Sequence, residues 1–306
     1  MKETYKKIGI IGAGSLGIAI YSFLKIKGFD VFCFDKDLKL IKKIKKEGLE
    51  IYNKRKIKIQ PFKIFKDLKF PFENLDFIII SVKSYDIKDV LKDLPEEAFS
   101  KPIVLVQNGL GVEDFFKGKR KLNLYRFVCH LAVYRKEGNK IFLKILKGEN
   151  YLGGGDEKSG KIIASSLSSA GFKTLYKRDI KKYSWEKTIL NCLLNPLCAI
   201  FQKNMKEVLK IGGIEFVLEN ILRESLEVAR AEGIIFNRNF EREALRYIKK
   251  GKDHIPSMVF DIKRGKTEID FLNGRISKIG KKHNIETPVN NFIVSLIKRF
   301  TDDRNI

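Results

Sequence analysis

Hydrophobic residues in the first half of the chain occur in short runs separated by amphipathic stretches. Four of these runs are rich in β-branched or aromatic residues and predict strands at residues 8–11, 31–34, 77–82 and 103–106. Strands that alternate with amphipathic stretches are typical of a parallel sheet wound with helices. Because ligands bind beyond the carboxyl ends of such strands, we expect the residues that follow them to line one crevice: Gly12, Asp35, Lys83, Asn108 and Gly109.

From about residue 181 onward the β character disappears, and apolar residues recur at spacings of three and four. Leu218, Ile221 and Leu222 are one example. This period is typical of α-helices that bury one face. The sequence therefore predicts an α/β domain over residues 1–178, with a parallel-type sheet, followed by an all-α domain over residues 179–306.

The formal net charge of +24 raises the question of a nucleic-acid partner. The lysines are spread along the whole chain, however, and their clusters lack the interleaved aromatic residues of a single-strand binding surface. We therefore expect lysines on solvated helix faces and no nucleic-acid partner. The positive field would still attract an anionic cofactor and an anionic substrate.

Cysteine and histidine usage argues against a metal site. The four cysteines are scattered with no C-x-x-C pair, and none of the three histidines stands at ligand spacing from another. No apolar run is long enough to span a bilayer, and nothing resembles a secretory leader. We expect a cytoplasmic protein with no metal and no membrane association.

The first strand runs directly into a G-x-G-x-x-G turn, followed by a helical stretch. In this pattern Gly12 makes the tight turn, Gly14 lets the backbone approach a pyrophosphate, and Gly17 allows close helix packing. The amides at the helix start then hold the phosphates. The sequence therefore predicts a Rossmann-like dinucleotide-binding domain whose cofactor loop comprises Gly12, Ala13, Gly14, Ser15, Leu16 and Gly17.

The two residues that directly follow the second strand give conflicting indications about which dinucleotide binds. A carboxylate there usually accepts hydrogen bonds from the ribose hydroxyls of NAD, whereas a cation usually meets the extra phosphate of NADP. Asp35 thus argues for NADH and Lys36 for NADPH. Either residue could instead be a solvated turn residue.

The run from residue 185 to 197 places Lys187, Asn191 and Asn195 at steps of four between apolar residues. In a helix these three side chains form one polar stripe, which would be costly to bury without partners, so we expect it to face a polar ligand. Pro196 removes one helix hydrogen bond beside the stripe. The alternative is an ordinary amphipathic helix with its polar side in water.

A second polar cluster lies near the carboxyl end. It contains Ser257, Asp261, Glu268 and Asp270. Taken alone, its carboxylates are explained as surface residues that pair with nearby cations. Its place in a longer series of motifs changes this interpretation.

Taken together, these motifs resemble the ketopantoate reductase (2-dehydropantoate 2-reductase) family along nearly the whole chain. The resemblance rests on the glycine turn, an N-G-x-G turn at residues 108–111, a K-x-x-x-N-x-x-x-N-P helix at 187–196, and an S-M-x-x-D segment with T-E-I-D-x-x-N-G over 257–274. It implies NAD(P)H-dependent reduction of 2-dehydropantoate to pantoate in pantothenate and coenzyme A biosynthesis. It also implies NADPH as cofactor, with NADH possible because of Asp35, and a homodimer.

The resemblance also implies a role for each motif residue. Lys187 would be the general acid, and Glu268 its charged partner or a holder of the site that also touches the cofactor. Asn191, Asn195 and Ser257 would bind substrate oxygens, while Asn108 would lie between nicotinamide and substrate. Lys83 would bind the adenosine end of the cofactor.

Two segments depart from the family pattern. The family usually carries arginine at the end of its second strand, where this chain has Lys36 after Asp35, and residues 127–135 lack the expected glycine-rich character. Two alternatives therefore stay open. One is a related reductase of another 2-keto acid or an imine, and the other is a nucleotide-binding sensor without catalysis.

Overall fold

The computed structural model describes residues 5–52, 56–60, 62–68, 71–119, 122–136, 139–145, 148–249, 253 and 255–302. The chain divides into two compact units. Unit 1 comprises residues 1–107 and 113–180, and unit 2 comprises residues 108–112 and 181–306. The predicted boundary after residue 178 falls two residues before this division. Loop 108–112, which follows a strand of unit 1 in the sequence, belongs by its contacts to unit 2.

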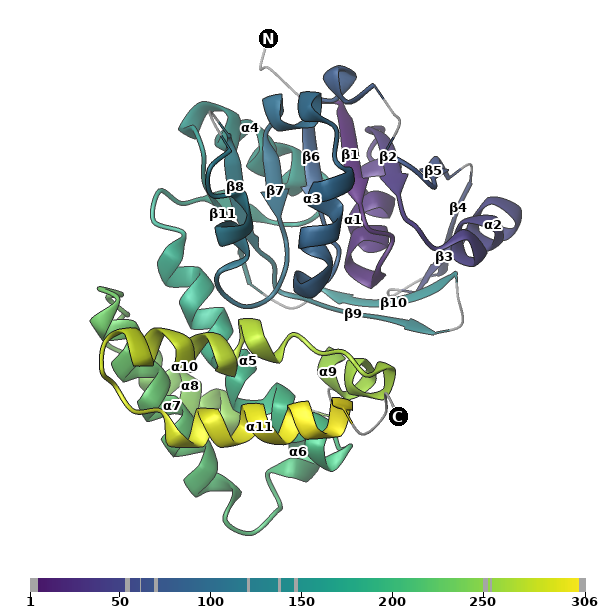
Figure 1. The fold of residues 1–306 in the computed structure, drawn as a ribbon. Helices are drawn as coiled ribbons and strands as arrows, with labels where there is room; N and C mark the ends of the chain where they lie inside the picture. The colour runs from purple at the N-terminus through teal and green to yellow at the C-terminus, as the bar shows by residue number, and fades with distance from the viewer. Residues whose placement is uncertain are drawn as a thin grey trace. The chain divides into compact units, whose positions relative to one another are not determined.

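Unit 1 is built on an eight-stranded, mostly parallel sheet in the order β12-β11-β8-β7-β6-β1-β2-β5 (Figure 1). Only the β8–β11 pair among its described strands is antiparallel. The strands are β1 (Lys7–Ile11), β2 (Asp30–Phe34), β5 (Ile64–Phe65), β6 (Phe77–Ile80), β7 (Ile103–Leu105), β8 (Leu124–Val128), β11 (Asn150–Gly154) and β12 (Thr174–Tyr176). The four predicted strands are confirmed as β1, β2, β6 and β7, and β6 and β7 end one or two residues earlier than expected.

The strand order reverses at β1. From β1 the chain first adds β2 on one side and later returns to add β6 on the other, both in parallel. The crossover helices of unit 1 are α1 (Ser15–Ile26), α2 (Leu38–Glu47), α3 (Ile87–Asp93) and α4 (Glu157–Ser169). In such a sheet the reversal leaves a crevice at the carboxyl end of β1, which is where the glycine turn lies.

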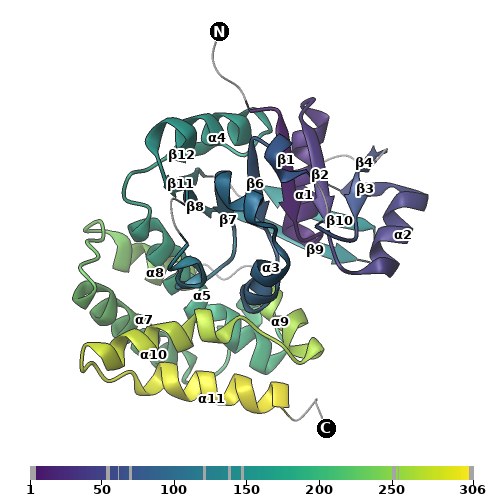
Figure 2. The same cartoon turned by 45° about the horizontal axis from the view of Figure 1, so that its top comes forward.

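A second, four-stranded sheet in unit 1 has the order β4-β3-β10-β9. Its strands are β3 (Leu49–Tyr52), β4 (Lys56–Ile59), β9 (Leu131–Lys136) and β10 (Lys140–Ile145). Helix α1 contacts β1 and β2 of the large sheet and also β9 and β10 of the small one, so it lies between the two sheets (Figures 1 and 2). The sequence analysis did not predict this sheet.

Unit 2 is helical, as predicted for the second half of the chain. Its helices are α5 (Lys181–Phe201), α6 (Met205–Val208), α7 (Ile214–Ala231), α8 (Phe240–Lys249), α9 (Ser257–Asp261), α10 (Asn273–Lys282) and α11 (Pro288–Asp302). The 21-residue α5 packs against α7, α9 and α11. Its apolar faces are buried in a core shared with those helices, because Ile189, Leu193 and Leu194 are all inaccessible to solvent.

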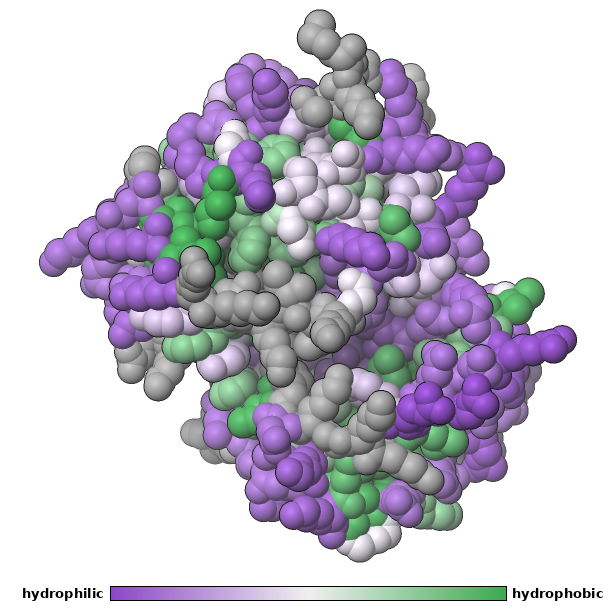
Figure 3. Space-filling view, turned by 180° about the vertical axis from the view of Figure 1, so that it is seen from behind, coloured by the Kyte–Doolittle hydropathy of each residue, from purple (hydrophilic) through white to green (hydrophobic). Residues whose placement is uncertain are grey.

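Within the described part of the chain, no helix combines the length and the apolar character needed to cross a membrane. Hydrophilic side chains occur over all parts of the face drawn in Figure 3. This distribution agrees with the spread of lysine along the sequence.

Candidate active site

The glycine turn of unit 1 is packed so closely that two of its glycines, Gly12 and Gly17, have no room for a side chain. Gly12 has φ +104°, which glycine adopts without strain, and a Cβ atom there would lie 2.7 Å from the amide nitrogen of Val82. A Cβ atom on Gly17 would overlap both the Gly12 carbonyl oxygen and the hydroxyl of Ser81, which donates to that carbonyl at 2.7 Å. The start of α1 therefore packs directly against the ends of β1 and β6.

The N-terminus of α1 has an exposed N-cap residue and no acidic side chain in its described first turn. Gly14 is its exposed N-cap residue, and no side chain bonds there; in the first turn, all of which is described, α1 carries no acidic residue. The first amides of a helix lack intrahelical partners and form the positive end of its dipole. Ser15 and Leu16 are half-buried beside Gly14. This turn has the donors and the open space that a phosphate group needs.

The carboxylate of Asp35 is directed at the loop backbone. Its Oδ2 accepts a hydrogen bond of 2.6 Å from the amide of Ala13, and its Oδ1 accepts one of 2.9 Å from the amide of Asp37. Lys36, the next residue, is exposed. One of the two residues that gave conflicting indications about the dinucleotide therefore supports the glycine turn, while the other projects into solvent.

Arg135 on β9 hydrogen-bonds to the same residue, Ala13, and was missed by sequence reasoning. Its guanidinium donates a hydrogen bond to the carbonyl oxygen of Ala13, 122 positions earlier in the chain. Asp35 thus binds the amide of Ala13, and Arg135 binds its carbonyl. Both charges also act on the thiol of Cys33: burial raises its pKa most, Asp35 raises the pKa further, and Arg135 lowers it.

Lys83 follows β6 and is half-buried immediately before the short 3-10 helix Ser84–Asp86. Beside it lies another residue that sequence reasoning missed. Gln107, which is 7 % exposed, donates from Nε2 to the carbonyls of Ile80 and Val82 at 2.8 and 3.1 Å. Gln107, which follows β7, therefore links the carboxyl end of β7 to the last residue of β6 and to the residue before Lys83.

In unit 2 the predicted polar stripe lies on α5. Lys187, Asn191 and Asn195 are each half-buried, whereas Thr188, Cys192 and most other residues between them are buried. Three polar side chains at steps of four share one face of the helix. The stripe is thus neither in the core nor on a fully exposed surface.

Loop 108–111 and the carboxyl-terminal motif contact each other within unit 2. The amide of Leu110 donates to the carbonyl of Phe271 at 2.9 Å. Gly109 has φ +84°, and a Cβ atom there would collide with the same Phe271 carbonyl. The N-G-x-G turn needs glycine because its backbone passes directly over the segment that follows Glu268.

The remaining predicted residues of unit 2 surround these elements. Ser257 is the exposed first residue of α9, which packs on α5, and Glu268 is 5 % exposed just before the 3-10 helix Ile269–Phe271. Asn108 is half-buried at the start of the loop. The motifs at 108–111, 187–196 and 257–274 are therefore parts of one unit. Direct contact between Lys187 and Glu268 stays a prediction.

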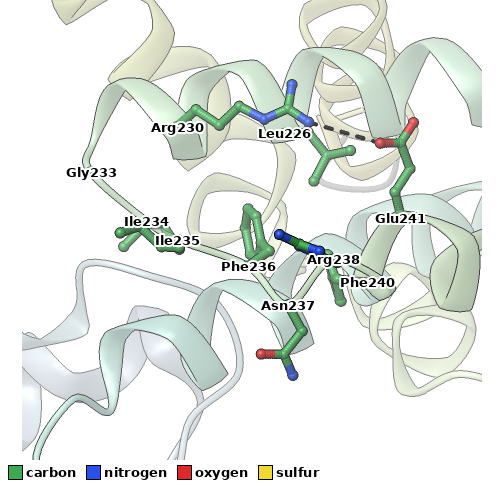
Figure 4. A pocket seen from close by; sticks show the side chains of 10 residues that line it. All are labelled: Leu226, Arg230, Gly233, Ile234, Ile235, Phe236, Asn237, Arg238, Phe240 and Glu241. Carbon is green, nitrogen blue, oxygen red and sulfur yellow. Dashed lines mark ion pairs between the residues drawn. The ribbon is translucent and has the colours of Figure 1, made fainter.

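A separate hollow of about 500 Å³ in unit 2 lies between the end of α7 and the start of α8 (Figure 4). It is lined by Leu226, Ile234, Phe236 and Phe240, and Arg230 pairs with Glu241 across it at 3.8 Å. None of the residues predicted from sequence lines this hollow.

Comparison with known proteins matches both units. The model of the ketopantoate reductase PanE/ApbA family matches residues 8–157, and that of its C-terminal domain matches residues 179–301. The chain belongs to this family. The family resemblance inferred from the motifs and the predicted fold class are both confirmed.

Named relatives in the ketopantoate reductase family cover almost the whole chain. The 2-dehydropantoate 2-reductase of Aquifex aeolicus is 32 % identical, over 95 % of this chain and 96 % of the relative. That of Pyrococcus abyssi is 27 % identical, over 95 % and 97 %.

Solved structures agree in fold. A ternary structure of D-mandelate dehydrogenase with NADH and anilino(oxo)acetate has 25 % identity and a TM-score of 0.87, covering 98 % of this chain and 99 % of that one. A PanE/ApbA family ketopantoate reductase from Ralstonia eutropha has 23 % identity and a TM-score of 0.88, covering 98 % of this chain and 100 % of that one. At this identity the similarity supports the fold only.

The glycine loop yields a prediction that separates folding from nucleotide binding. A Cβ atom on Gly14 would meet the Ser81 carbonyl oxygen at 3.8 Å, an ordinary contact, and Gly14 has φ −64°. Gly14→Ala should therefore fold normally but place a methyl group where the sequence motif predicts that a pyrophosphate approaches the backbone. We expect an unchanged Tm and an affinity for NADPH lowered by about tenfold or more, measured by fluorescence titration.

Two further variants, Gly17→Ala and Gly212→Ala, serve as controls for this experiment. The first should lower Tm because its methyl group meets the Gly12 backbone, and the second should change neither quantity because nothing lies within 4 Å of its Cβ position. Unchanged NADPH affinity in Gly14→Ala would mean that the turn does not hold the cofactor phosphates.

Proposed function

We propose that this chain is an NADPH-dependent 2-dehydropantoate 2-reductase, which reduces the ketone of a small, branched hydroxy-keto acid to an alcohol. The observation that carries the proposal is the half-buried stripe of Lys187, Asn191 and Asn195 on a helix whose intervening residues are mostly buried. An ammonium and two amides kept at the edge of a core suit a polar, anionic ligand. The named relatives along the full chain support the same substrate.

The residues of unit 1 fit a dinucleotide. The exposed N-cap Gly14, the free first amides of α1 and the absence of an acidic residue in that described turn suit a pyrophosphate. Lys83, half-buried after β6, would bind the adenosine end. When bound, the nicotinamide supplies the hydride.

Lys187 would act on the keto oxygen. As the carbonyl carbon is reduced, negative charge builds on that oxygen, and an ammonium beside it stabilises the charge and then donates a proton. Glu268, a carboxylate that is 5 % exposed, would hold the Lys187 ammonium in place and touch the cofactor. A carboxylate that is this buried needs a cation or hydrogen-bond donors beside it, and the Lys187 ammonium would supply both.

Asn191, Asn195 and Ser257 would bind the fixed oxygens of the substrate. Amides and a hydroxyl orient the hydroxyl and carboxylate groups, and they discriminate against keto acids that lack a hydroxyl, since a bound polar group would then be left unpaired. Asn108 would lie between nicotinamide and substrate. Its loop is fixed to the Glu268 segment by the bond from Leu110 to Phe271.

The proposed preference for NADPH rests on the different roles of Asp35 and Lys36. Both carboxylate oxygens of Asp35 accept hydrogen bonds from backbone amides, so this residue serves the glycine turn. Lys36 is exposed beside it, and its ammonium would bind a 2′-phosphate. The resemblance further supports a homodimer and a cytoplasmic location as parts of the proposal.

The reaction is tested by following NADPH absorbance with the purified protein and ketopantoate. We expect steady oxidation of NADPH with ketopantoate. The rate should be at least about tenfold lower with branched keto acids that lack the hydroxyl, and with a keto acid plus an amine. Faster turnover of the keto acid corresponding to mandelate would overturn the substrate assignment while retaining the reaction class.

Lys187→Ala tests the proton donor. Because the variant loses both charge stabilisation and proton transfer, kcat should fall by about 10²- to 10⁴-fold while NADPH affinity stays unchanged. Lys181→Ala, an exposed lysine at the start of the same helix, is the matched control. Equal turnover in the two variants would remove Lys187 from the mechanism.

Lys36→Ala tests cofactor preference. Loss of its ammonium should raise the KM for NADPH by about tenfold, the effect of one charge-assisted hydrogen bond, and leave the KM for NADH unchanged. Lys39→Ala, also exposed and in the first turn of α2, should alter neither value. A wild-type enzyme that prefers NADH would contradict the assignment of Lys36.

A further inference from the structure

Helix α5 has a backbone carbonyl without its usual helical partner. In an α-helix the carbonyl of residue 192 accepts from the amide of residue 196, but residue 196 is proline and has no N–H. Cys192 follows Asn191 in the sequence, outside the stripe, and it is inaccessible to solvent. An unpaired backbone carbonyl at such a buried position is costly, so a donor must come from elsewhere.

That donor is the side chain of Asn273, the first residue of α10. Its Nδ2 donates to the Cys192 carbonyl at 3.2 Å and also to Oδ1 of Asn290 at 2.9 Å. Both asparagines are inaccessible to solvent. A primary amide has two hydrogens on its nitrogen, and both are used here.

The chain of bonds continues to a buried charge on α7. Asn290 donates from Nδ2 to Oε2 of Glu224 at 2.7 Å, and Glu224 is 3 % exposed. The carboxylate also accepts from the backbone amides of Val289 and Asn290, each at 2.9 Å. These amides lie in the first turn of α11, which begins at Pro288, so a negative charge caps the positive end of that helix.

We propose that Asn273, backed by Asn290 and Glu224, is a positioning residue for substrate recognition. It replaces the hydrogen bond that Pro196 removes and so fixes the turn of α5 that presents Asn191 and Asn195. Because these amides are one residue before Cys192 and one before Pro196, a shift of the freed peptide alters their direction toward the substrate. The glycine turn lies in unit 1, outside this hydrogen-bond network. The proposal rests on the proposed function for the identity of the substrate.

A double-mutant cycle tests this role. Asn273→Ala should raise the KM for ketopantoate by about tenfold with the KM for NADPH unchanged, since a buried carbonyl loses its donor. Pro196→Ala supplies a backbone N–H to the same carbonyl. In that background Asn273→Ala should therefore raise the KM for ketopantoate by only about twofold to threefold.

The matched control is Asn291→Ala, which removes an exposed amide next to Asn290 on α11 and should leave both KM values unchanged. Asn290→Ala keeps the bond from Asn273 to the Cys192 carbonyl but removes the Asn290 side chain that orients Asn273. It should therefore raise the KM for ketopantoate less than Asn273→Ala does. This variant keeps the proposal testable if Asn273→Ala does not fold. An equal effect of Asn273→Ala in both backgrounds, or a lowered Tm with unchanged kinetics, would overturn the proposal.

Hydrogen exchange separates this proposal from the proposed function. In the protein without substrate, backbone amides of residues 191–199 should exchange faster in Asn273→Ala and slow again in the double variant. Absence of that pattern overturns the positioning role. Absence of ketopantoate reduction by the wild-type protein overturns the proposed function alone.

Discussion

Unit 2 depends on keeping one polar stripe at the edge of a helix whose other faces form the core. Lys187, Asn191 and Asn195 need access to a ligand, while their neighbours on α5 are buried against α7, α9 and α11. Pro196 adds a second demand, because it leaves the Cys192 carbonyl without an amide. The buried amides of Asn273 and Asn290 meet that demand with a donor fixed by Glu224. This buried chain of hydrogen bonds thus ends on the carbonyl that Pro196 leaves without an amide.

Unit 1 meets a similar demand with glycine and with paired charges. Its turn brings β1, β6 and α1 so close that Gly12 and Gly17 have no space for a Cβ atom. The peptide groups of Ala13 then point to charged side chains, with its amide bonded to Asp35 and its carbonyl to Arg135. Gly14, the N-cap residue of α1, remains exposed. In both units, tight packing decides which backbone groups are held by the protein and which are left for a ligand.

Features that depend on neighbours in sequence could be predicted, and those that depend on distant partners could not. The strand, glycine turn and helix are consecutive, and the stripe on α5 follows from a step of four, so both were found from sequence. Arg135 reaches Ala13 across 122 positions, from a sheet whose short strands were not predicted. Asn273 was recognised as part of a motif, but its acceptor on α5 is 81 positions away. No local pattern gives such pairings.

Asp35 shows why a residue type at a signature position does not by itself decide cofactor choice. From sequence, a carboxylate after the second strand argues for NADH. In the fold its two oxygens accept from the amides of Ala13 and Asp37, and Arg135 lies on the other side of Ala13. A carboxylate engaged in this way stabilises the turn, because both of its oxygens accept from backbone amides of the loop. Under the proposed function, the choice between the two dinucleotides would then depend on Lys36, whose exposed ammonium would favour a 2′-phosphate.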